Sequence, residues 1–239
     1  MNPLLSEVLE AYGGLDRWRN FTTVSSTLVT GGEFWGVKGL LIDTVPRRMT
    51  TDLHREWSSI TPFGDPNWRS DFTPDHVAIL ARDGATIAER SDPRAAFEGH
   101  GLATPWDPLH RAYFNGYAMW TYMTTPFVFV EPGYEITEIA PVQHNNEDWR
   151  GLRVNFPKDV ATHSREQDFY FGSDGLLRRH DYHVDVAGGF AAAHFVSDFI
   201  DVNGLRFPTR RRAYPRGDDL QPNLDRLLVS IDISDYALN

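Results

Sequence analysis

The sequence contains no cysteine among its 239 residues. Disulfide bonds, thiol nucleophiles and thiolate metal ligands are therefore excluded. Long apolar runs are also missing: no stretch approaches the ~20 residues that cross a bilayer as a helix, so we expect no integral membrane segment. The N-terminal residues 1–14 have neither a basic start nor a long apolar core, which is unlike a signal peptide. We therefore expect a cytoplasmic protein.

Several motifs with a known chemistry are absent as well. The chain has no GxSxG elbow, no phosphate-binding loop, no HExxH and no dinucleotide fingerprint. These absences argue against catalysis by a serine nucleophile and against a nucleotide cofactor. We predict no cofactor. Acidic residues outnumber basic ones by 33 to 23, a net charge of −10, which argues against nucleic acid or an anionic membrane as a partner.

What the sequence has in quantity is aromatic residues, 13% of the total. They are dense in residues 104–125, where the pattern predicts a central helix. Thr104 can serve as its N-cap, and Pro105 fits the first helical position. Asp107 would place a carboxylate in the first turn, where it interacts favourably with the helix dipole. Apolar residues cover nearly the whole surface of this helix, so we expect it to be buried. They recur at helical spacing at Leu109, Tyr113, Gly116, Tyr117 and Trp120.

The rest of the chain predicts strands. Residues 3–12 form a short amphipathic helix that ends at Gly13-Gly14. From residue 21 onward, β-branched and aromatic segments alternate with turns, and Asn203-Gly204 is a strong hairpin signal. Segments near 34–45, 47–60 and 127–131 are among the expected strands. No linker or internal repeat divides the chain, so we expect one domain over residues 1–239.

The predicted fold class is mainly β (α+β). We expect a curved antiparallel sheet, or unclosed β-barrel, of roughly eleven strands wrapped over the central helix, with a short N-terminal helix.

The alternation of side chains on the last four strands sorts their residues by face. One face mixes apolar groups with strong hydrogen-bonding groups, which is typical of a ligand pocket, and we assign it to the concave side. The other is mostly charged and predicts a solvent-facing surface. A one-residue slip in register would reverse the sorting. The predicted concave face carries His163, Arg165, Gln167, Phe169, His180, Tyr182, Phe195, Arg210 and Arg212. The predicted outer face carries Glu166, Asp181, His183, His194 and Arg211.

Four residues of the predicted concave face are candidate catalytic groups. His163, His180 and Tyr182 can exchange protons, and Arg165 can stabilise an anion. The alternative is that these side chains satisfy one another's hydrogen bonds. The candidate ligand-binding residues are His110, Tyr113, Tyr117, Trp120, Gln167, Phe169, Phe195, Arg210 and Arg212. The alternative for the residues of the helix is that they only pack in the protein core. The alternative for Arg210 and Arg212 is that they lie on a strand exposed to solvent.

A metal site is a lesser alternative. His183 and His194 could face each other across the Gly188-Gly189 turn, with Asp181 and Glu166 nearby, and two histidines with a carboxylate can bind a metal ion. Neighbouring histidines on a hairpin are more often surface residues. We predict no metal.

Three segments are similar to proteins of the lipoprotein-carrier (LolA/LolB-like) half-barrel superfamily. They are EAYGGLDRWRNF (10–21), YFGSDGLLRRHDY (170–182) and VNGLRFPTRRRAYP (202–215). The resemblance implies a long antiparallel meander, a helical insertion over its concave face, and a hydrophobic cavity between them. With no export signal or lipidated cysteine, the chain resembles a cytosolic branch of that superfamily.

Two functions are compatible with these features. In the first, the half-barrel binds a hydrophobic or aromatic small molecule and performs cofactor-free acid–base chemistry of the isomerase, cyclase or lyase type. In the second, the same cavity serves a non-catalytic carrier or sensor of a lipid or small molecule. Whether the protein is an enzyme is left open. Seven tryptophans leave room for an exposed aromatic patch and a homodimer.

Overall fold

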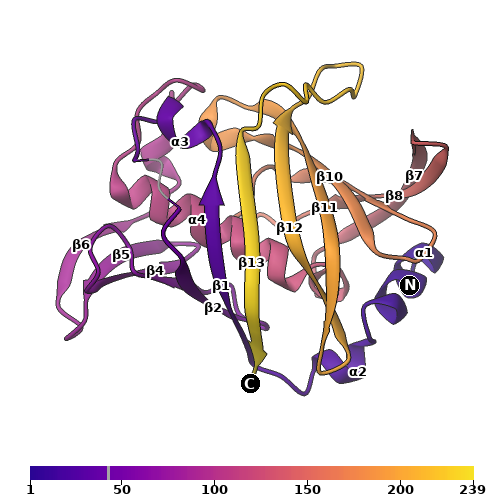
Figure 1. Ribbon diagram of the computed structural model, residues 1–239, viewed down its shortest axis with the longest axis horizontal. Coiled ribbons are helices and arrows are strands. Elements are labelled where there is room, and N and C mark those ends of the chain that lie inside the picture. Colours follow the sequence, from indigo (N-terminus) through magenta and orange to yellow (C-terminus); the bar gives the residue numbers. More distant parts are fainter. Residues whose placement is uncertain (42–43) are drawn as a thin grey trace.

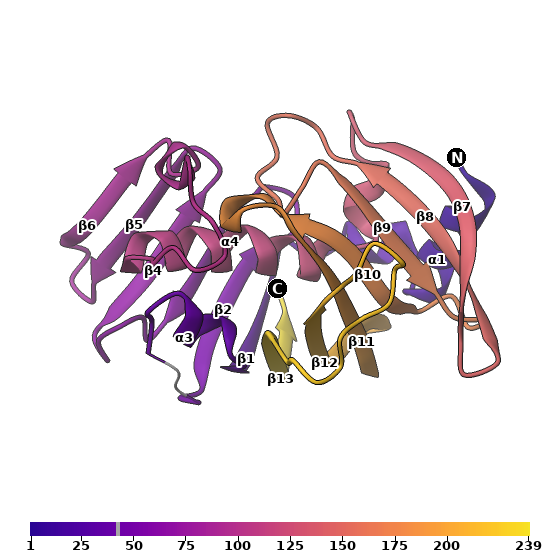
Figure 2. The same ribbon diagram turned by 90° about the horizontal axis from the view of Figure 1, so that it is seen from above.

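A computed structural model of the protein describes residues 1–41 and 44–239. Thirteen strands in these residues form one antiparallel sheet, in the order β6-β5-β4-β3-β2-β1-β13-β12-β11-β10-β9-β8-β7. The edge strands β6 and β7 do not pair with each other, so the sheet curves without closing (Figures 1 and 2). The predicted fold class is confirmed, with thirteen strands where roughly eleven were expected. The strands are β1 Thr23–Gly31, β2 Arg47–Asp52, β3 Ser58–Thr61, β4 Trp68–Thr73, β5 His76–Ala81, β6 Thr86–Ser91, β7 Glu135–His144, β8 Glu147–Asn155, β9 Glu166–Phe171, β10 Leu177–Val184, β11 Phe190–Val202, β12 Leu205–Pro215 and β13 Val229–Leu238.

The strand order explains why the chain needs a central helix. β1 to β6 run from the middle of the sheet to one edge, and β7 to β13 return from the other edge to pair with β1. The connection between the two edges must therefore cross the concave face. Helix α4 (Pro108–Thr124) makes this crossing: at 1.5 Å per residue its 17 residues span about 25 Å. Figure 2 shows α4 lying in the trough of the curved sheet.

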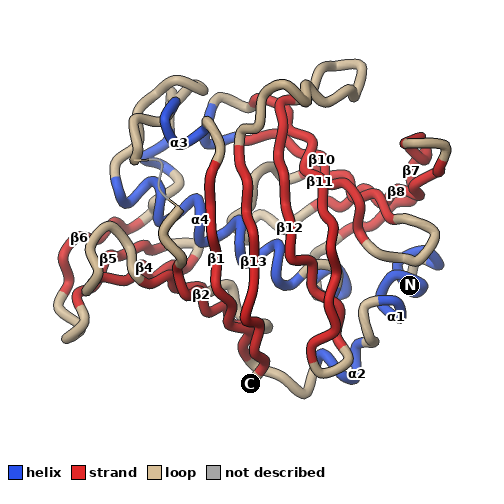
Figure 3. Tube along the Cα trace, viewed as in Figure 1, coloured by secondary structure: helices blue, strands red, loops and turns tan. Residues whose placement is uncertain are grey.

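Smaller helices lie at the rim of the sheet (Figure 3). The N-terminal helix predicted over residues 3–12 is confirmed. The α-helices besides α4 are α1 Pro3–Ala11, α2 Leu15–Trp18 and α3 Phe34–Val37, and the 3₁₀ helices are η1 Ala95–Phe97, η2 Phe127–Val130 and η3 Asp185–Ala187.

Helix α4 begins three residues later than predicted. Asp107, not Thr104, is the N-cap: its carboxylate accepts the His110 N–H at 2.8 Å, and His110 Nδ1 accepts the Asp107 N–H at 3.2 Å. These two hydrogen bonds satisfy two backbone N–H groups that have no carbonyl partner within the helix. Pro108, and not Pro105, then occupies the first helical position. The Thr104 hydroxyl instead accepts the Gly101 N–H.

One glycine sets how closely α4 approaches the sheet. A Cβ atom at Gly116 would lie 2.2 Å from Cγ of Phe72 on β4, so only glycine permits this contact. The backbone of α4 is close to β2–β6. Tyr122 reaches the other half of the sheet through its side chain, which contacts Tyr182 and Arg211.

Three expected strands differ in the structure. The segment near 34–45 begins with the helix α3, and its residues 42 and 43 lie outside the described residues. The segment 47–60 is divided into β2 and β3, and 127–131 contains η2. In contrast, the Asn203-Gly204 hairpin is confirmed, with φ angles of 55° and 82°.

Candidate ligand site beneath the central helix

The connection between β10 and β11 decides which residues face α4. A two-residue turn at Gly188-Gly189 was expected, but residues 185–189 connect the strands and include η3. As a result His180 pairs with His194, and Tyr182 pairs with Ala192. The predicted register is therefore wrong by three residues. Because this number is odd, Phe195 on β11 and Arg210 and Arg212 on β12 face the side opposite to the one predicted.

The reversal moves three predicted ligand-binding residues to the convex face. Phe195 packs there against His144 and Trp149. Arg212 forms an ion pair with Asp232 at 2.6 Å, and half-exposed Arg210 lies 3.9 Å from Asp198. None of the three lies beneath α4.

Arg165 does not join the other candidate catalytic groups either. It is exposed just before β9, and its peptide carbonyl accepts the Phe156 N–H. His163, His180 and Tyr182 do come together. The Tyr182 ring stacks on His163 with centroids 4.1 Å apart and lies 4.6 Å from that of His180.

A buried hydrogen-bond network connects α4 to these strands, and we call it the tyrosine–histidine network. Tyr122 is its centre: its hydroxyl lies 2.8 Å from Nε2 of His163 and 3.3 Å from the Tyr182 hydroxyl. The Tyr117 hydroxyl lies 3.3 Å from Nδ1 of His163. The Tyr182 hydroxyl also lies 3.4 Å from Nδ1 of His194. Since a neutral histidine donates from one nitrogen only, one of the two tyrosines must donate to His163.

His180 lies beside this network with a fixed tautomer. The Gln167 amide nitrogen donates to Thr162 Oγ1 and to the Ser164 carbonyl, so its oxygen faces His180. That oxygen lies 2.6 Å from Nε2 of His180, which must therefore carry the proton. Phe169 stacks on the same ring at 4.1 Å. Nδ1 of His180 is buried with no hydrogen-bond partner among the described residues.

Burial keeps these groups neutral. Desolvation lowers the pKa of His163 to about 3, and it lowers the pKa values of His180 and His194 well below their usual range. Burial also raises the pKa of Tyr122 to about 12. At neutral pH the network therefore offers uncharged donors and acceptors, and its histidines are weak bases.

Sequence reasoning missed Arg211, which it placed on the solvent face. Arg211 is 2% exposed, and its guanidinium lies 4.4 Å above the Tyr122 ring. Its Nη2 donates to the Tyr122 carbonyl at 3.0 Å, near the end of α4. Burial lowers its pKa, but guanidinium stays protonated in proteins. A signal existed: in Arg210-Arg211-Arg212 on a strand, the middle residue must face away from the other two.

A small cavity lies between α4 and the sheet beside this network. Its volume is about 40 Å³, room for about one or two water molecules. Most of its wall is apolar, and Tyr122, Tyr182 and His194 form a polar part. Its lining residues are Leu28, Thr30, Trp35, Arg47, Ile60, Arg111, Phe114, Asn115, Ala118, Met119, Tyr122, Tyr182, His194, Ala213, Val229 and Ile231.

The remaining predicted residues of the helix have different positions. His110 caps α4, and its Nε2 lies 3.2 Å from the Ala96 carbonyl. Tyr113 is buried, and burial raises the pKa of its hydroxyl although the nearby Arg94 charge opposes this shift. Trp120 donates to the Asp52 carbonyl at 3.1 Å and lines a separate cleft where α4 ends.

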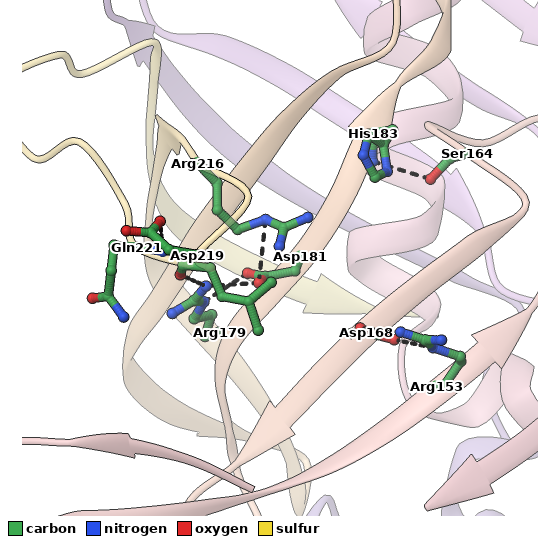
Figure 4. Close-up of polar contacts among 10 residues, drawn as sticks. Arg153, Ser164, Asp168, Arg179, Asp181, His183, Arg216, Asp219 and Gln221 are labelled. Atoms are coloured by element: carbon green, nitrogen blue, oxygen red, sulfur yellow. Dashed lines mark hydrogen bonds and ion pairs between the residues drawn. The ribbon is translucent and has the colours of Figure 1, made fainter. Parts of the chain in front are cut away.

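The convex face carries a second buried polar group, which we call the convex ion-pair cluster (Figure 4). Arg179 binds Asp181 through two hydrogen bonds of 2.6 and 2.7 Å, and Arg216 approaches the same carboxylate at 3.5 Å. Arg179 also donates to the Leu220 carbonyl, so the loop after β12 covers the cluster. Burial raises the pKa of Asp181 despite both arginines.

The metal alternative does not fit these positions. His183 is exposed on the convex side, whereas His194 is buried beneath α4, so the two histidines lie on opposite faces of the sheet. Within residues 1–41 and 44–239 no three His, Asp or Glu side chains are grouped as metal ligands would be.

Comparisons with known proteins identify the fold. No family model and no curated protein matches the sequence. A DUF1329 family protein from Desulfovibrio piger superposes with a TM-score of 0.54 at 11% identity, over 99% of this chain and 92% of its own. A LolA superfamily protein from Nitrosomonas europaea gives 0.53 at 11% identity, with 98% and 93% covered. A lipoprotein-sorting domain from Vibrio parahaemolyticus gives 0.53 at 8% identity, with 98% and 92% covered.

Among the described residues, no helix is long and apolar enough to cross a membrane. Identities this low show the fold alone, and the predicted resemblance is confirmed at that level. The chain has the LolA-like half-barrel fold, with α4 as the helix across its concave face.

Proposed function

We propose that the protein binds a hydrophobic small molecule with a compact polar group beneath α4, as a carrier or sensor. The observation that carries this proposal is the cavity itself, an apolar space with Tyr122, Tyr182 and His194 on one part of its wall. Hydrophobic pockets with a few convergent polar groups are the usual form of small-molecule sites.

The chemistry of the wall defines the ligand. Apolar side chains of α4 and the central strands would contact its body, at about 25 cal/mol for each Å² removed from water. The tyrosine hydroxyls would hydrogen-bond its polar group. Because the histidines beside them are neutral, they offer hydrogen bonds without adding charge to this part of the wall.

A ligand of drug or lipid size needs more space than about 40 Å³. Entry therefore requires α4 and the sheet to separate on the side where long side chains, and not the helix backbone, make the contact. The lipoprotein-sorting description of the Vibrio relative supports a hydrophobic ligand. A cytoplasmic location and a homodimer stay predictions from the sequence.

Acid–base catalysis in the same cavity is the second candidate. One observation favours it, namely that Tyr182 and His194 line the cavity and are 3.4 Å apart. The depressed pKa values of the histidines oppose it, because a general base is most effective with a pKa near the working pH. Carriage therefore ranks first. An enzyme that uses this pair would lose turnover but keep most of its ligand affinity in a His194→Phe variant, whereas a carrier has no turnover to lose.

The cavity can be tested with N-phenyl-1-naphthylamine, a neutral probe that fluoresces in apolar surroundings. Ala118→Leu fills the cavity from α4 and should weaken probe binding at least about tenfold. Ala237→Leu adds the same atoms at an exposed position and should leave affinity unchanged. Equal affinity in both variants and the natural protein would place the probe elsewhere and refute the proposed site. Native mass spectrometry of untagged protein would then identify any co-purifying ligand.

A further inference from the structure

A second hollow lies where α4 ends, and its lining shares no residue with the cavity beneath the helix. Its volume is about 430 Å³, within the range of about 300–1,000 Å³ usual for small-molecule sites. Trp120 of α4 and Val128 of η2 form part of its floor. The turn between β2 and β3 and the segments before β7 and after β8 form its sides. We call it the C-terminal cleft of α4.

Glu56, in the β2–β3 turn, lines this cleft, and only one of its two carboxylate oxygens has a hydrogen-bond partner among the described residues. Its Oε2 accepts the Ala161 N–H at 3.1 Å. Its Oε1 is buried, and no group among the described residues hydrogen-bonds to it. Burial raises the pKa of Glu56 well above its usual range. Leaving a buried carboxylate oxygen unpaired costs free energy that a donor would recover.

A second unpartnered group comes from a different element. The Tyr134 hydroxyl, just before β7, is also buried without a hydrogen-bond partner among the described residues. Its ring packs on Phe156 with centroids 5.2 Å apart, which holds the side chain in place. Tyr134 and Glu56 line the same cleft, and the Glu56 charge acts on the Tyr134 hydroxyl. Two orphaned oxygens in one cleft indicate a ligand with hydrogen-bond donors.

The surrounding charges favour a cation. Exposed Glu131 and Asp159 add two carboxylates to the lining. The basic lining residues are Arg55, which forms an ion pair with Asp52 at 3.7 Å, and His54.

Arg94 is the other cation whose charge reaches Glu56, but its guanidinium already has partners. Its Nη1 donates to the Thr162 carbonyl, and its Nη2 pairs with Asp185. Its charge lowers the pKa of Glu56 without offsetting the effect of burial. Arg94 therefore does not replace a cation bound in the cleft.

The remaining walls are mostly apolar. We propose that the C-terminal cleft of α4 binds a primary ammonium ion with an apolar body, with Glu56 as its counter-ion and Tyr134 as a second hydrogen-bond partner. The ammonium supplies donors to both oxygens, and the body lies on Trp120 and the prolines, where an aromatic face also attracts a cation. The apolar lining residues are Leu53, Pro74, Trp120, Val128, Pro132, Pro157 and Val160.

Three matched probes test the proposal by isothermal titration calorimetry. Benzylammonium carries charge and N–H donors, benzyltrimethylammonium carries charge alone, and benzyl alcohol carries neither charge nor an ammonium donor. We expect benzylammonium to bind at least about tenfold more tightly than the other two. Equal affinity for all three would show a merely apolar cleft, and equal affinity for the two cations would remove the hydrogen-bonding role. Either result overturns the proposal.

Isosteric variants locate the site. Glu56→Gln removes the charge and should reduce benzylammonium affinity about tenfold or more, whereas Glu10→Gln, at an exposed position in α1, should not change it. Tyr134→Phe removes one hydroxyl and should cause a smaller loss of a few-fold. Unchanged affinity in Glu56→Gln would overturn the proposal. N-phenyl-1-naphthylamine binding should be the same in all these variants, so failure here is distinguishable from failure of the cavity beneath α4.

The pH dependence gives an independent readout. A cation requires ionised Glu56, so benzylammonium affinity should fall as the pH is lowered through the raised pKa of this residue. In Glu56→Gln the affinity should lose that dependence. The same pH profile in both proteins would contradict the assigned counter-ion.

Discussion

The tyrosine–histidine network beneath α4 and the convex ion-pair cluster are buried in opposite ways. Beneath α4, the tyrosine–histidine network satisfies itself with neutral hydrogen bonds, and burial keeps its histidines uncharged. On the convex face, Asp181 is 3% exposed and is held as an ion by two arginines. A neutral group costs much less to desolvate than an ion does, so the first arrangement tolerates the loss of one partner better than the second.

This difference suits different roles. Hydroxyl and imidazole groups can exchange partners with a ligand without leaving a bare charge in an apolar space. The convex ion-pair cluster cannot exchange partners in this way. It instead holds the loop after β12 in place, because Arg179 donates a hydrogen bond to the Leu220 carbonyl. Polar groups beneath α4 are thus suited to binding, and those on the convex face to holding one structure.

The largest effect is expected from breaking the convex cluster. Asp181→Ala leaves Arg179 and Arg216 without their carboxylate in a buried site, which should lower the free energy of unfolding by about 3–5 kcal/mol. The neighbouring pair Arg153–Asp168 (Figure 4) is a matched control, because Arg153 is 40% exposed. Asp168→Ala should cost about 1 kcal/mol or less. Urea unfolding measures both, and equal losses would contradict the contrast between buried and exposed pairs.

An intermediate effect comes from acid. Unfolded His163 takes up a proton below its ordinary pKa of about 6.5, whereas folded His163 stays neutral down to about 3. The free energy of unfolding should therefore fall with decreasing pH in this window, by about 2 kcal/mol between pH 7 and pH 5 from this residue alone.

The variant His163→Phe isolates that contribution. Its stability should fall about 2 kcal/mol less than that of the natural protein over the same pH interval. His183→Gln, at an exposed position, should keep the natural dependence. If His163→Phe shows the full loss, the folded histidine is charged and the concave network is not neutral.

The smallest effect is expected from a single neutral hydroxyl. Tyr182→Phe removes hydrogen bonds to Tyr122 and His194 and should cost about 1 kcal/mol, well below the cost of Asp181→Ala. Tyr214→Phe, on the convex face, provides the control for removing a phenolic oxygen, with an expected change near zero. Chemical denaturation distinguishes the two. A loss from Tyr182→Phe as large as that from Asp181→Ala would show that neutral and charged groups are equally dependent on their partners.

Local signals in the sequence were sufficient for the main elements of the fold. The aromatic periodicity of residues 109–120 predicted a buried helix, and Asn203-Gly204 predicted a hairpin, because each depends on neighbouring residues alone. The helix start was misplaced because Thr104-Pro105 and Asp107-Pro108 are similar capping signals. Only the reciprocal hydrogen bonds between the backbone N–H of each of Asp107 and His110 and the side chain of the other distinguish them.

The candidate site was less predictable because it depends on register. Residues 185–189 contain a short 3₁₀ helix that no local pattern distinguished from a two-residue turn, and this changed the face of Phe195 on β11 and of the three arginines 210–212 on β12. His163, His180 and Tyr182 lie before that turn and were placed together correctly. Arg211 lies after it and was assigned to solvent. Glu56 and Tyr134 gave no signal, since nothing local shows that two distant turns share a cleft.

The contact between Gly116 and Phe72 has a mechanical consequence. It fixes the middle of α4 against β4, because the missing side chain lets the Phe72 ring touch the helix backbone. Contacts with the other half of the sheet are made by side chains, such as Tyr122 with Tyr182 and Arg211, which can change rotamer without breaking a strand. Under the proposed function, space for a ligand would therefore open between α4 and strands β10 to β12, and the reach of these side chains would limit its size.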